Sequence, residues 1–257
     1  MTSQDAARMP RRRLLRLGLA AAGLAGAAAA CGTAPAPPAA TAPRPPPPRP
    51  TRPGLAPGAP APEVERGSGG RPEVALTFHG AGDPGLAKQV LTALHDRGAA
   101  VTVLAVGTWL AQSPDSARVV TDLGHELGNH TWSHGDIDTM SESAARAEIE
   151  RCRDRIAALT GGPGAFFRPS QAQHATSRVK VLAAAAGYPT VLSYDVDSRD
   201  FTDPGAAAIR RNVAGATAGA VVSMHLGHPG TLQAIPGLLD DLAARGLRPV
   251  TASQLFA

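Results

Sequence analysis

The sequence is poor in cysteine, in long apolar runs and, over most of its length, in surplus positive charge. Two cysteines occur in 257 residues, and Cys152 falls in a helical pattern where packing explains it. No disulfide framework is therefore predicted. The apolar run at residues 17–30 has 14 residues, fewer than the about 20 that a helix needs to span a bilayer.

Positive charge is concentrated in the first 62 residues. They contain 14 of the 24 prolines, eight arginines and a single acidic residue, which gives a net charge of +7. Residues 63–257 contain 17 basic and 20 acidic side chains, a net charge of −3. The pI of about 9.7 therefore reflects the N-terminal segment. We expect no nucleic-acid partner for the remainder of the chain.

Residues 1–31 have the pattern of an export signal. Arginines at positions 11–13 and 16 precede the apolar run, and paired arginines before two leucines resemble a twin-arginine signal. The run ends in Ala-Ala-Ala-Cys31, which is similar to a bacterial lipoprotein box with Ala28 where leucine is usual. The alternative is an ordinary signal cut near Ala30, with Cys31 incidental. We predict an exported protein, either anchored by a lipid on Cys31 to the outer face of the cytoplasmic membrane or released into the cell wall.

Residues 32–71 are predicted to be a linker. Most of this segment consists of alanine, proline, threonine and arginine, with four consecutive prolines at 45–48. Such a composition cannot bury a core and favours a stiff, extended chain. The linker would hold the following domain, residues 72–257, away from the membrane.

Residues 72–257 alternate short apolar strands with helical patterns. The strands are predicted at residues 73–78, 99–106, 126–130, 165–168, 190–195, 220–225 and 247–251. This alternation is typical of an α/β fold with a parallel sheet and right-handed crossovers. Seven largely apolar strands suit a closed or nearly closed barrel, although an open sheet would give the same periodicity.

Polar side chains follow the predicted strands at their carboxyl ends. They are His79, His130, Arg168, Asp195, Asp197, Asp200 and His225. Because the carboxyl ends of parallel strands meet at one end of a barrel, these side chains are expected to form one site. His130 and His134 lie four residues apart, so a single turn can present both imidazoles to one metal ion.

Five segments, in order, resemble the motifs of the NodB-homology polysaccharide deacetylases, carbohydrate esterase family four. They are Thr-Phe-His-Gly-Ala at 77–81, His-Thr-Trp-Ser-His at 130–134, Phe-Arg-Pro at 167–169, Asp-Phe at 200–201 and Val-Ser-Met-His at 222–225. The resemblance covers residues 72–255. It implies a distorted (β/α) barrel of about seven parallel strands.

The resemblance also implies an activity. Family members hold a divalent metal, with zinc as the first expectation, on two histidines and one aspartate; the metal activates the water that attacks the acetamide. By resemblance, His130 and His134 are metal ligands, His225 is a general acid oriented by Asp200, and Arg168 orients the base. The expected substrate is an N-acetylated or O-acetylated cell-envelope polysaccharide such as peptidoglycan. The expected reaction is hydrolysis of a carbon–nitrogen bond other than a peptide bond.

The first motif departs from the family. The family has two aspartates, a base and the third metal ligand, where this chain has His79 and Gly80. Three accounts follow. His79 is the base and Asp83 the third ligand; or His79 is the third ligand and Asp83 the base; or the metal is lost and the fold serves as a non-catalytic wall-binding module. A different carbon–nitrogen hydrolase on the same scaffold is a further alternative.

Three more residues are candidate substrate contacts. Trp132 could stack on a sugar ring, although packing beneath the 130–134 segment is the favoured explanation. His174 follows the third motif on a loop, and His228 lies three residues beyond His225. Both are therefore expected close to the site.

Overall fold

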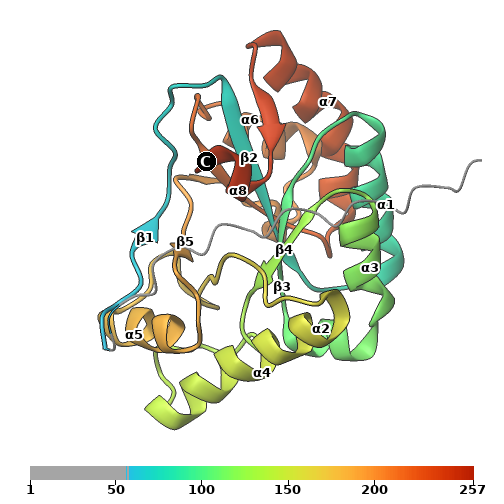
Figure 1. Cartoon of the computed structure of the whole chain (residues 1–257). Coiled ribbons are helices and arrows are strands. Elements are labelled where there is room, and N and C mark those ends of the chain that lie inside the picture. The colour runs from blue at the N-terminus through green and yellow to red at the C-terminus, as the bar shows by residue number, and fades with distance from the viewer. Residues whose placement is uncertain (1–55, 57) are drawn as a thin grey trace, which may run out of the picture. The chain divides into compact units, whose positions relative to one another are not determined.

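The computed structural model describes residue 56 and residues 58–257. The predicted signal at 1–31, with Cys31, and most of the predicted linker lie outside these residues. Figure 1 shows a set of parallel strands surrounded by helices. None of the helices in the described residues has the length and the apolar stretch needed to cross a membrane.

The centre of the fold is a six-stranded sheet with neighbours in the order β4-β3-β2-β7-β6, and with β8 paired to the start of β2. The strands of the chain are β1 (Glu63–Val64), β2 (Glu73–Gly80), β3 (Thr102–Ala105), β4 (Glu126–Asn129), β5 (Val191–Leu192), β6 (Val196–Asp197), β7 (Val221–His225) and β8 (Arg248–Val250). Every pairing between these strands is parallel. The predicted parallel α/β fold is confirmed.

Isolated β-bridges extend the sheet so that it nearly closes into a barrel. Phe167 bridges Asn129 at the end of β4 and Val191 in β5, and β5 pairs with β1. Arg66, just after β1, bridges Ala220 just before β7 in the antiparallel sense. The sheet therefore continues through short links from β4 round to β7, which is the distorted barrel that the sequence predicted.

The helices cover the outside of this sheet (Figure 1). They are α1 (Pro84–Asp96), α2 (Gly107–Gln112), α3 (Asp115–Asp122), α4 (Glu142–Thr160), α5 (Ser177–Ala185), α6 (Ala206–Val213), α7 (Pro229–Ala244), α8 (Ala252–Leu255) and the 3₁₀ turn η1 (Asp200–Thr202). The longest of them, α4, begins at Ser141, whose side chain accepts from Ala144 N, and ends at Gly161 in the left-handed region. These are the cap residues that helix ends favour.

The alternation of side chains along β2 separates the core from the site. Val74, Leu76 and Phe78 point into the apolar layer beneath α1 and α7, whereas Thr77 and His79 point to the inside of the barrel, where both contact Arg168. Because successive strand residues face opposite sides, one strand both anchors the helices and delivers His79 to the barrel mouth.

The folded domain begins before residue 72. β1 pairs with β5, Val191 N donates to Pro62 O at 2.9 Å, and Ala61 is buried. The prediction that the linker extends to residue 71 is therefore wrong for the segment from Ala61 onward. A two-residue strand next to a proline-rich stretch carries no periodicity from which it could be predicted.

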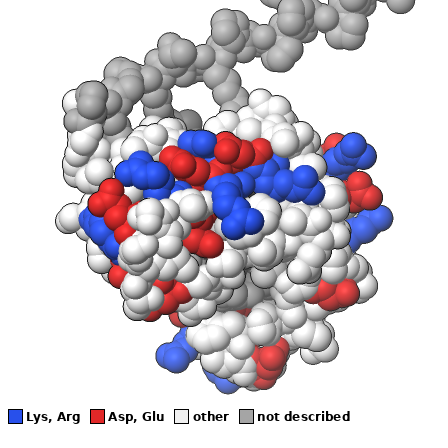
Figure 2. Space-filling model, turned by 90° about the horizontal axis from the view of Figure 1, so that it is seen from below, with Lys and Arg blue, Asp and Glu red and all other residues white. Residues whose placement is uncertain are grey.

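α4 carries acidic and basic side chains in equal number. α4 contains four acidic and four basic residues, and the view from below in Figure 2, the side on which α4 lies in Figure 1, shows the two signs interspersed. Such a face has no single-sign field that would attract a polyelectrolyte over a distance.

Candidate active site

Four histidines meet at the carboxyl ends of β2, β4 and β7. The ring centroid of His79 lies 4.2 Å from that of His130 and 4.4 Å from that of His225, and the His130 and His134 centroids are 4.8 Å apart. One nitrogen from each of His79, His130 and His134 lies within 4.8 Å of the others. The structure therefore brings together the histidines that the sequence singled out.

The segment from His130 to His134 is a tight turn and not a helix. Thr131 and His134 have φ of 66° and 61°, a left-handed conformation that non-glycine residues adopt only when neighbouring contacts hold them. Asn129 Oδ1 accepts from Thr131 N at 2.8 Å, and Thr131 Oγ1 accepts from His134 N at 3.2 Å. Both imidazoles reach the same centre because of this turn.

His130 has the features of a metal ligand. Its Nδ1 lies 3.1 Å from the carbonyl oxygen of Arg168, to which only a protonated Nδ1 can donate, so Nε2 carries the lone pair. Nε2 is buried and has no hydrogen-bond partner within the described residues. Burial, followed by the neighbouring His134, lowers the pKa of His130 well below its ordinary value. A neutral imidazole whose other nitrogen is held by a carbonyl is the arrangement that a divalent metal requires.

His134 is the second residue that fits a metal. Burial and the nearby His225 lower its pKa, which keeps the ring neutral. Its Nδ1 lies 3.1 Å from the Gln171 side-chain nitrogen. The same nitrogen donates to His134 O at 3.2 Å, so it is the amide NH₂ group that faces the ring and Nδ1 accepts from it. A metal bound through Nε2 would therefore require Gln171 to release Nδ1, so that the ring proton can move there.

His79 is held by Arg168. Arg168 Nη1 lies 3.2 Å from His79 Nε2, and since a guanidinium can only donate, Nε2 must accept and the ring proton must reside on Nδ1. Burial, then His130 and then Arg168 lower the pKa of His79 well below its ordinary value. The only lone pair of the neutral ring is thus engaged. A metal bound by His79, or a proton taken up by it, would compete with this hydrogen bond.

Arg168 is buried without a carboxylate partner. Its other donors reach Leu192 O at 2.8 Å, Ser193 O at 3.1 Å and Thr77 Oγ1 at 2.9 Å. No carboxylate is among its hydrogen-bond partners in the part of the chain that the structure describes. Burial lowers the pKa of Arg168 to about 9, because desolvation disfavours the cation.

His225 and Asp200 form a hydrogen-bonded pair. His225 Nδ1 donates to Asp200 Oδ1 at 2.7 Å, and Asp200 Oδ2 accepts from His225 N at 2.8 Å and from Thr231 Oγ1 at 2.6 Å. Burial would raise the pKa of Asp200, but the hydrogen bonds and charge of His225, together with Thr231, outweigh it and lower the pKa. The ionised carboxylate fixes the His225 tautomer, so Nε2 is available for proton transfer.

The altered first motif has no aspartate at Gly80, and Asp83 was the expected substitute for it as ligand or base. Asp83 is exposed and caps α1, with Oδ1 accepting from Leu86 N at 2.7 Å, and it is not part of the histidine cluster. At Gly80 a Cβ atom would lie 2.8 Å from Val103 Cγ1 and 3.1 Å from Trp109 Cζ3. The position of the family's second aspartate is therefore closed by apolar packing.

The three residues predicted as substrate contacts have different surroundings. Trp132 packs against Gly107 and beneath the Arg151 guanidinium, 4.2 Å from the ring centroid. His174 is exposed, with Nδ1 3.6 Å from Glu63 Oε1, on the side of β1. His228 is closer, with its ring centroid 5.9 Å from that of His225 and Nδ1 3.1 Å from Asp203 Oδ1.

The other predicted strand-end acids have structural partners. Asp195 pairs with Arg66 at 2.5 Å and accepts from Val221 N. Asp197 accepts from Arg199 N at 2.8 Å. Neither belongs to the histidine cluster.

Two residues near the cluster, Thr231 and Phe201, were not among the residues predicted for the site. Thr231, on the first turn of α7, is buried and donates to Asp200; nothing in the sequence marks a threonine 31 residues away as its partner. Phe201 is 45 % exposed, with its ring centroid 5.3 Å from that of His225. Its place beside Asp200 in the fourth motif was the available signal.

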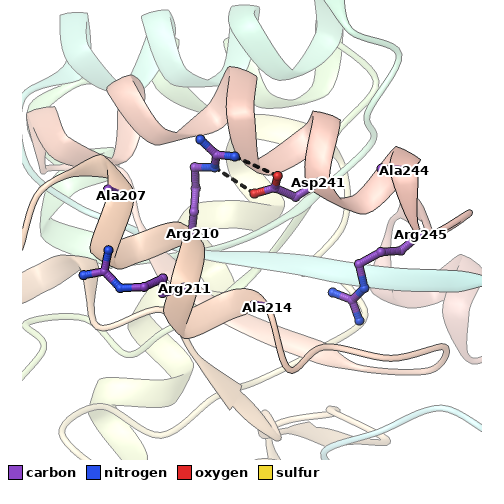
Figure 3. A pocket seen from close by; sticks show the side chains of 7 residues that line it. All are labelled: Ala207, Arg210, Arg211, Ala214, Asp241, Ala244 and Arg245. Atoms are coloured by element: carbon purple, nitrogen blue, oxygen red, sulfur yellow. Dashed lines mark hydrogen bonds and ion pairs between the residues drawn. The ribbon is translucent and has the colours of Figure 1, made fainter.

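A hollow of about 450 Å³ lies between α6 and α7 and is separate from this site (Figure 3). It is lined by Ala207, Arg210, Arg211, Ala214, Asp241, Ala244 and Arg245. Arg210 pairs with Asp241 through two contacts of 2.7 Å. The arginines lie near the carboxyl ends of both helices, where cations stabilise the helix dipole, so their placement needs no ligand.

Comparison with known proteins gives the family. The model for polysaccharide deacetylases matches residues 66–191. A peptidoglycan-N-acetylglucosamine deacetylase of Bacillus cereus is 32% identical over 188 residues, which cover 71% of this chain and 87% of that protein. This chain belongs to the polysaccharide deacetylase family, and the resemblance stated from its motifs is confirmed.

Solved structures agree with this assignment. A family 4 carbohydrate esterase from Streptomyces lividans, in complex with acetate, is 30% identical with a TM-score of 0.65, covering 69% of this chain and 91% of that chain. A CE4 family pseudoenzyme from Bacillus anthracis has a TM-score of 0.71 at 23% identity, covering 78% of this chain and 69% of that chain. The second likeness bears on the fold alone.

Proposed function

We propose that this chain is a metal-dependent polysaccharide deacetylase that hydrolyses the acetamide group of N-acetylated sugars. The observation that carries the proposal is the buried Nε2 of His130, which has no hydrogen-bond partner among the described residues. It lies beside a second neutral histidine and the Asp200–His225 pair. An orphaned acceptor is costly in a folded interior unless a ligand engages it. A divalent ion is the ligand that suits two neutral imidazoles.

His130 and His134 would hold the ion. Zinc is the first candidate because it favours imidazole nitrogen and keeps open positions at catalytic sites. A divalent ion bound there supplies a water of lowered pKa and a positive charge for the oxyanion. With two side-chain ligands, the affinity is expected to be lower than that of sites with three protein ligands.

His225 would move the proton. Asp200 holds the proton on Nδ1, so Nε2 can take a proton from the attacking water and then give it to the departing amine. The carbon–nitrogen bond breaks, and acetate and the free amine are the products. This extends the general-acid role that the motif implied for His225.

His79 would act as a hydrogen-bond donor. Arg168 engages the Nε2 lone pair, which leaves Nδ1–H as the polar group that the ring can offer to a reacting oxygen. A neutral imidazole can polarise a carbonyl in this way. In this proposal Asp83 remains the cap of α1 and takes no part in the chemistry.

The proposed substrate is the N-acetylglucosamine of peptidoglycan or a similar envelope polymer. The similarity to the peptidoglycan-N-acetylglucosamine deacetylase of Bacillus cereus supports this class. The export pattern of residues 1–31 supports an extracytoplasmic location. Lipidation of Cys31 and anchoring to the membrane remain predictions from the sequence.

The test is acetate release by the full chain from N-acetylglucosamine oligomers and from peptidoglycan, with and without added zinc or cobalt. We expect release that depends on the metal. His225→Ala should lower kcat by about 10²- to 10⁴-fold, the usual contribution of a general acid–base, while the metal stays bound. The absence of both metal binding and acetate release would contradict the proposal.

A second candidate is a non-catalytic carbohydrate-binding protein on the same fold. The observation that favours it is the packing around Gly80, which removes the family's third ligand. Binding of the same oligomers without metal and without acetate release would establish it.

A further inference from the structure

The turn that joins His130 to His134 lies between the beginning of α2 and the middle of α4. On one side, Gly107 N donates to Thr131 O at 2.9 Å and Thr108 N donates to Trp132 O at 2.8 Å. Trp132 also packs closely on Gly107, because a Cβ atom there would lie 2.4 Å from the Trp132 ring. The carbonyl groups of the turn are thus bound by the first backbone N–H groups of a helix, which have no partners within it.

The N–H groups of the turn are bound from the other side by one carboxylate. Glu148, on the second turn of α4, has Oε2 3.0 Å from Trp132 N and 2.7 Å from Ser133 N, and its Oε1 accepts from Ser133 Oγ at 2.9 Å. Both carboxylate oxygens are therefore used on two adjacent residues of the turn. Hydrogen bonds to an ionised acceptor are stronger than neutral ones.

We infer that Glu148 is a positioning residue for the metal-binding turn, an inference that rests on the proposed function. The turn needs such support because Thr131 and His134 are both in the left-handed region, which isolated threonine and histidine rarely occupy. Among the described residues, the hydrogen bonds of Glu148 go to Trp132 and Ser133 and not to either histidine ring. It acts by fixing the backbone on which both rings are mounted.

The neighbouring residues of α4 strengthen the assignment. Arg151, one turn along, lies over the Trp132 ring, and Asn129 Nδ2 donates to Ile149 O at 2.9 Å. Residues 148–151 of α4 therefore contact the residue before His130 and the residue in the middle of the turn. Covering the sheet does not require α4 to direct a charged side chain at the backbone N–H groups of the turn.

The test compares cobalt and zinc affinity in Glu148→Ala, Glu148→Gln and the control Glu150→Ala in the full chain. Glu150 lies on the same helix but has no hydrogen-bond or ion-pair partner among the described residues. Loss of the support of a metal ligand typically lowers affinity by about 10- to 100-fold. We expect a loss of this size in Glu148→Ala, a smaller loss in Glu148→Gln, whose amide oxygen still accepts, and parental affinity in Glu150→Ala.

Kinetics separate positioning from general stability. If Glu148 positions the ligands, kcat of Glu148→Ala at subsaturating metal should fall and recover when metal is raised, while KM for the oligosaccharide stays near the parental value. Equal metal affinity in Glu148→Ala and the parent would overturn the inference. If Glu148→Ala does not fold, the same comparison is made with Glu148→Gln, and parental affinity there, with unchanged amide exchange, overturns it.

A metal-free readout distinguishes failure of this inference from failure of the proposed function. Hydrogen exchange at the amides of Trp132 and Ser133 should be slow in the parent and about tenfold or more faster in Glu148→Ala, with the amides of β2 unchanged. A parent that binds no metal but shows this difference would refute the proposed function and leave the support of the turn intact. Unchanged exchange at both amides would refute the role of Glu148.

Discussion

Arg168 donates a hydrogen bond to His79, with 3.2 Å between Nη1 and Nε2. A carboxylate at this position could accept from the guanidinium and still keep further lone pairs. A neutral imidazole has only one lone pair, and Arg168 engages it. The histidine that replaces the family's base is therefore neither a free base nor a free ligand in this structure, and its remaining N–H group is what it can offer.

The donor role of His79 is tested by comparing two substitutions. His79→Gln can accept from Arg168 through its oxygen and still donate through its amide nitrogen, whereas His79→Ala can do neither. We expect kcat to fall by about 10²- to 10³-fold in His79→Ala, the usual effect of removing one oxyanion donor, and to stay within about tenfold of the parent in His79→Gln. Equal losses in both variants would indicate a base and contradict the donor role.

Arg168 has no carboxylate partner among the described residues, and this predicts an effect on stability. His79→Asp would give the buried guanidinium a carboxylate partner, and His79→Asn is the matched neutral control. A hydrogen bond to a charged group contributes about 1.5–3 kcal/mol, so the free energy of unfolding of His79→Asp should exceed that of His79→Asn by about this amount. Urea denaturation measures it. A less stable aspartate variant would show that Arg168 is satisfied without a counter-charge.

Gly80 is predicted to resist even a small side chain. The added Cβ of Gly80→Ala would meet Val103, Ala105 and Trp109 at 2.8–3.1 Å, and overpacking of this kind costs about 1–3 kcal/mol. Gly162→Ala is the control, because no atom lies within 4 Å of a Cβ there. Thermal unfolding of the two variants gives the comparison. If Gly80→Ala unfolds at the same temperature as the parent, the space for a third ligand can still open.

Asp200 is predicted to make stability depend on pH in the acid range. Its pKa is lowered in the folded state, so the unfolded chain binds the proton first as the pH falls. The stabilisation is therefore complete above the ordinary pKa of an aspartate, about 3.9, and is lost as the pH falls through the lower folded pKa. Between about pH 5 and pH 3, Asp200→Asn should show a shallower loss of unfolding free energy than the parent. A parental curve for Asp200→Asn would contradict the expectation.

The fold was predictable because it follows from patterns along the chain. Parallel strands buried on both faces give continuous apolar runs, and β2, β3 and β7 were located from these runs within a few residues. The strand expected at 165–168 is reduced to a bridge at Phe167, because Pro169 cannot donate to a ladder. β1 and α2 were missed since a two-residue strand and a six-residue helix are too short to show a period.

The sequence indicated four histidines that lie together in the structure, but not the hydrogen bonds among the surrounding residues, and it wrongly placed Asp83 beside them. Strand ends and motif order brought together His79, His130, His134 and His225. The cap at Asp83 had a readable signal, since an aspartate followed by proline and glycine before an apolar run is typical of a helix start. The contact between Arg168 and His79 and the packing at Gly80 depend on residues far apart in the sequence, so no local pattern could indicate them.

The most direct test of the central claim is the cobalt affinity of the parent chain beside His79→Gln. The claim is that His130 and His134 hold the metal while Arg168 holds His79. It predicts about one bound ion per chain at saturation in both proteins and dissociation constants that agree within about threefold. A fall in affinity of about tenfold or more in His79→Gln would contradict the account, because it would make His79 the third ligand and require Arg168 to release it.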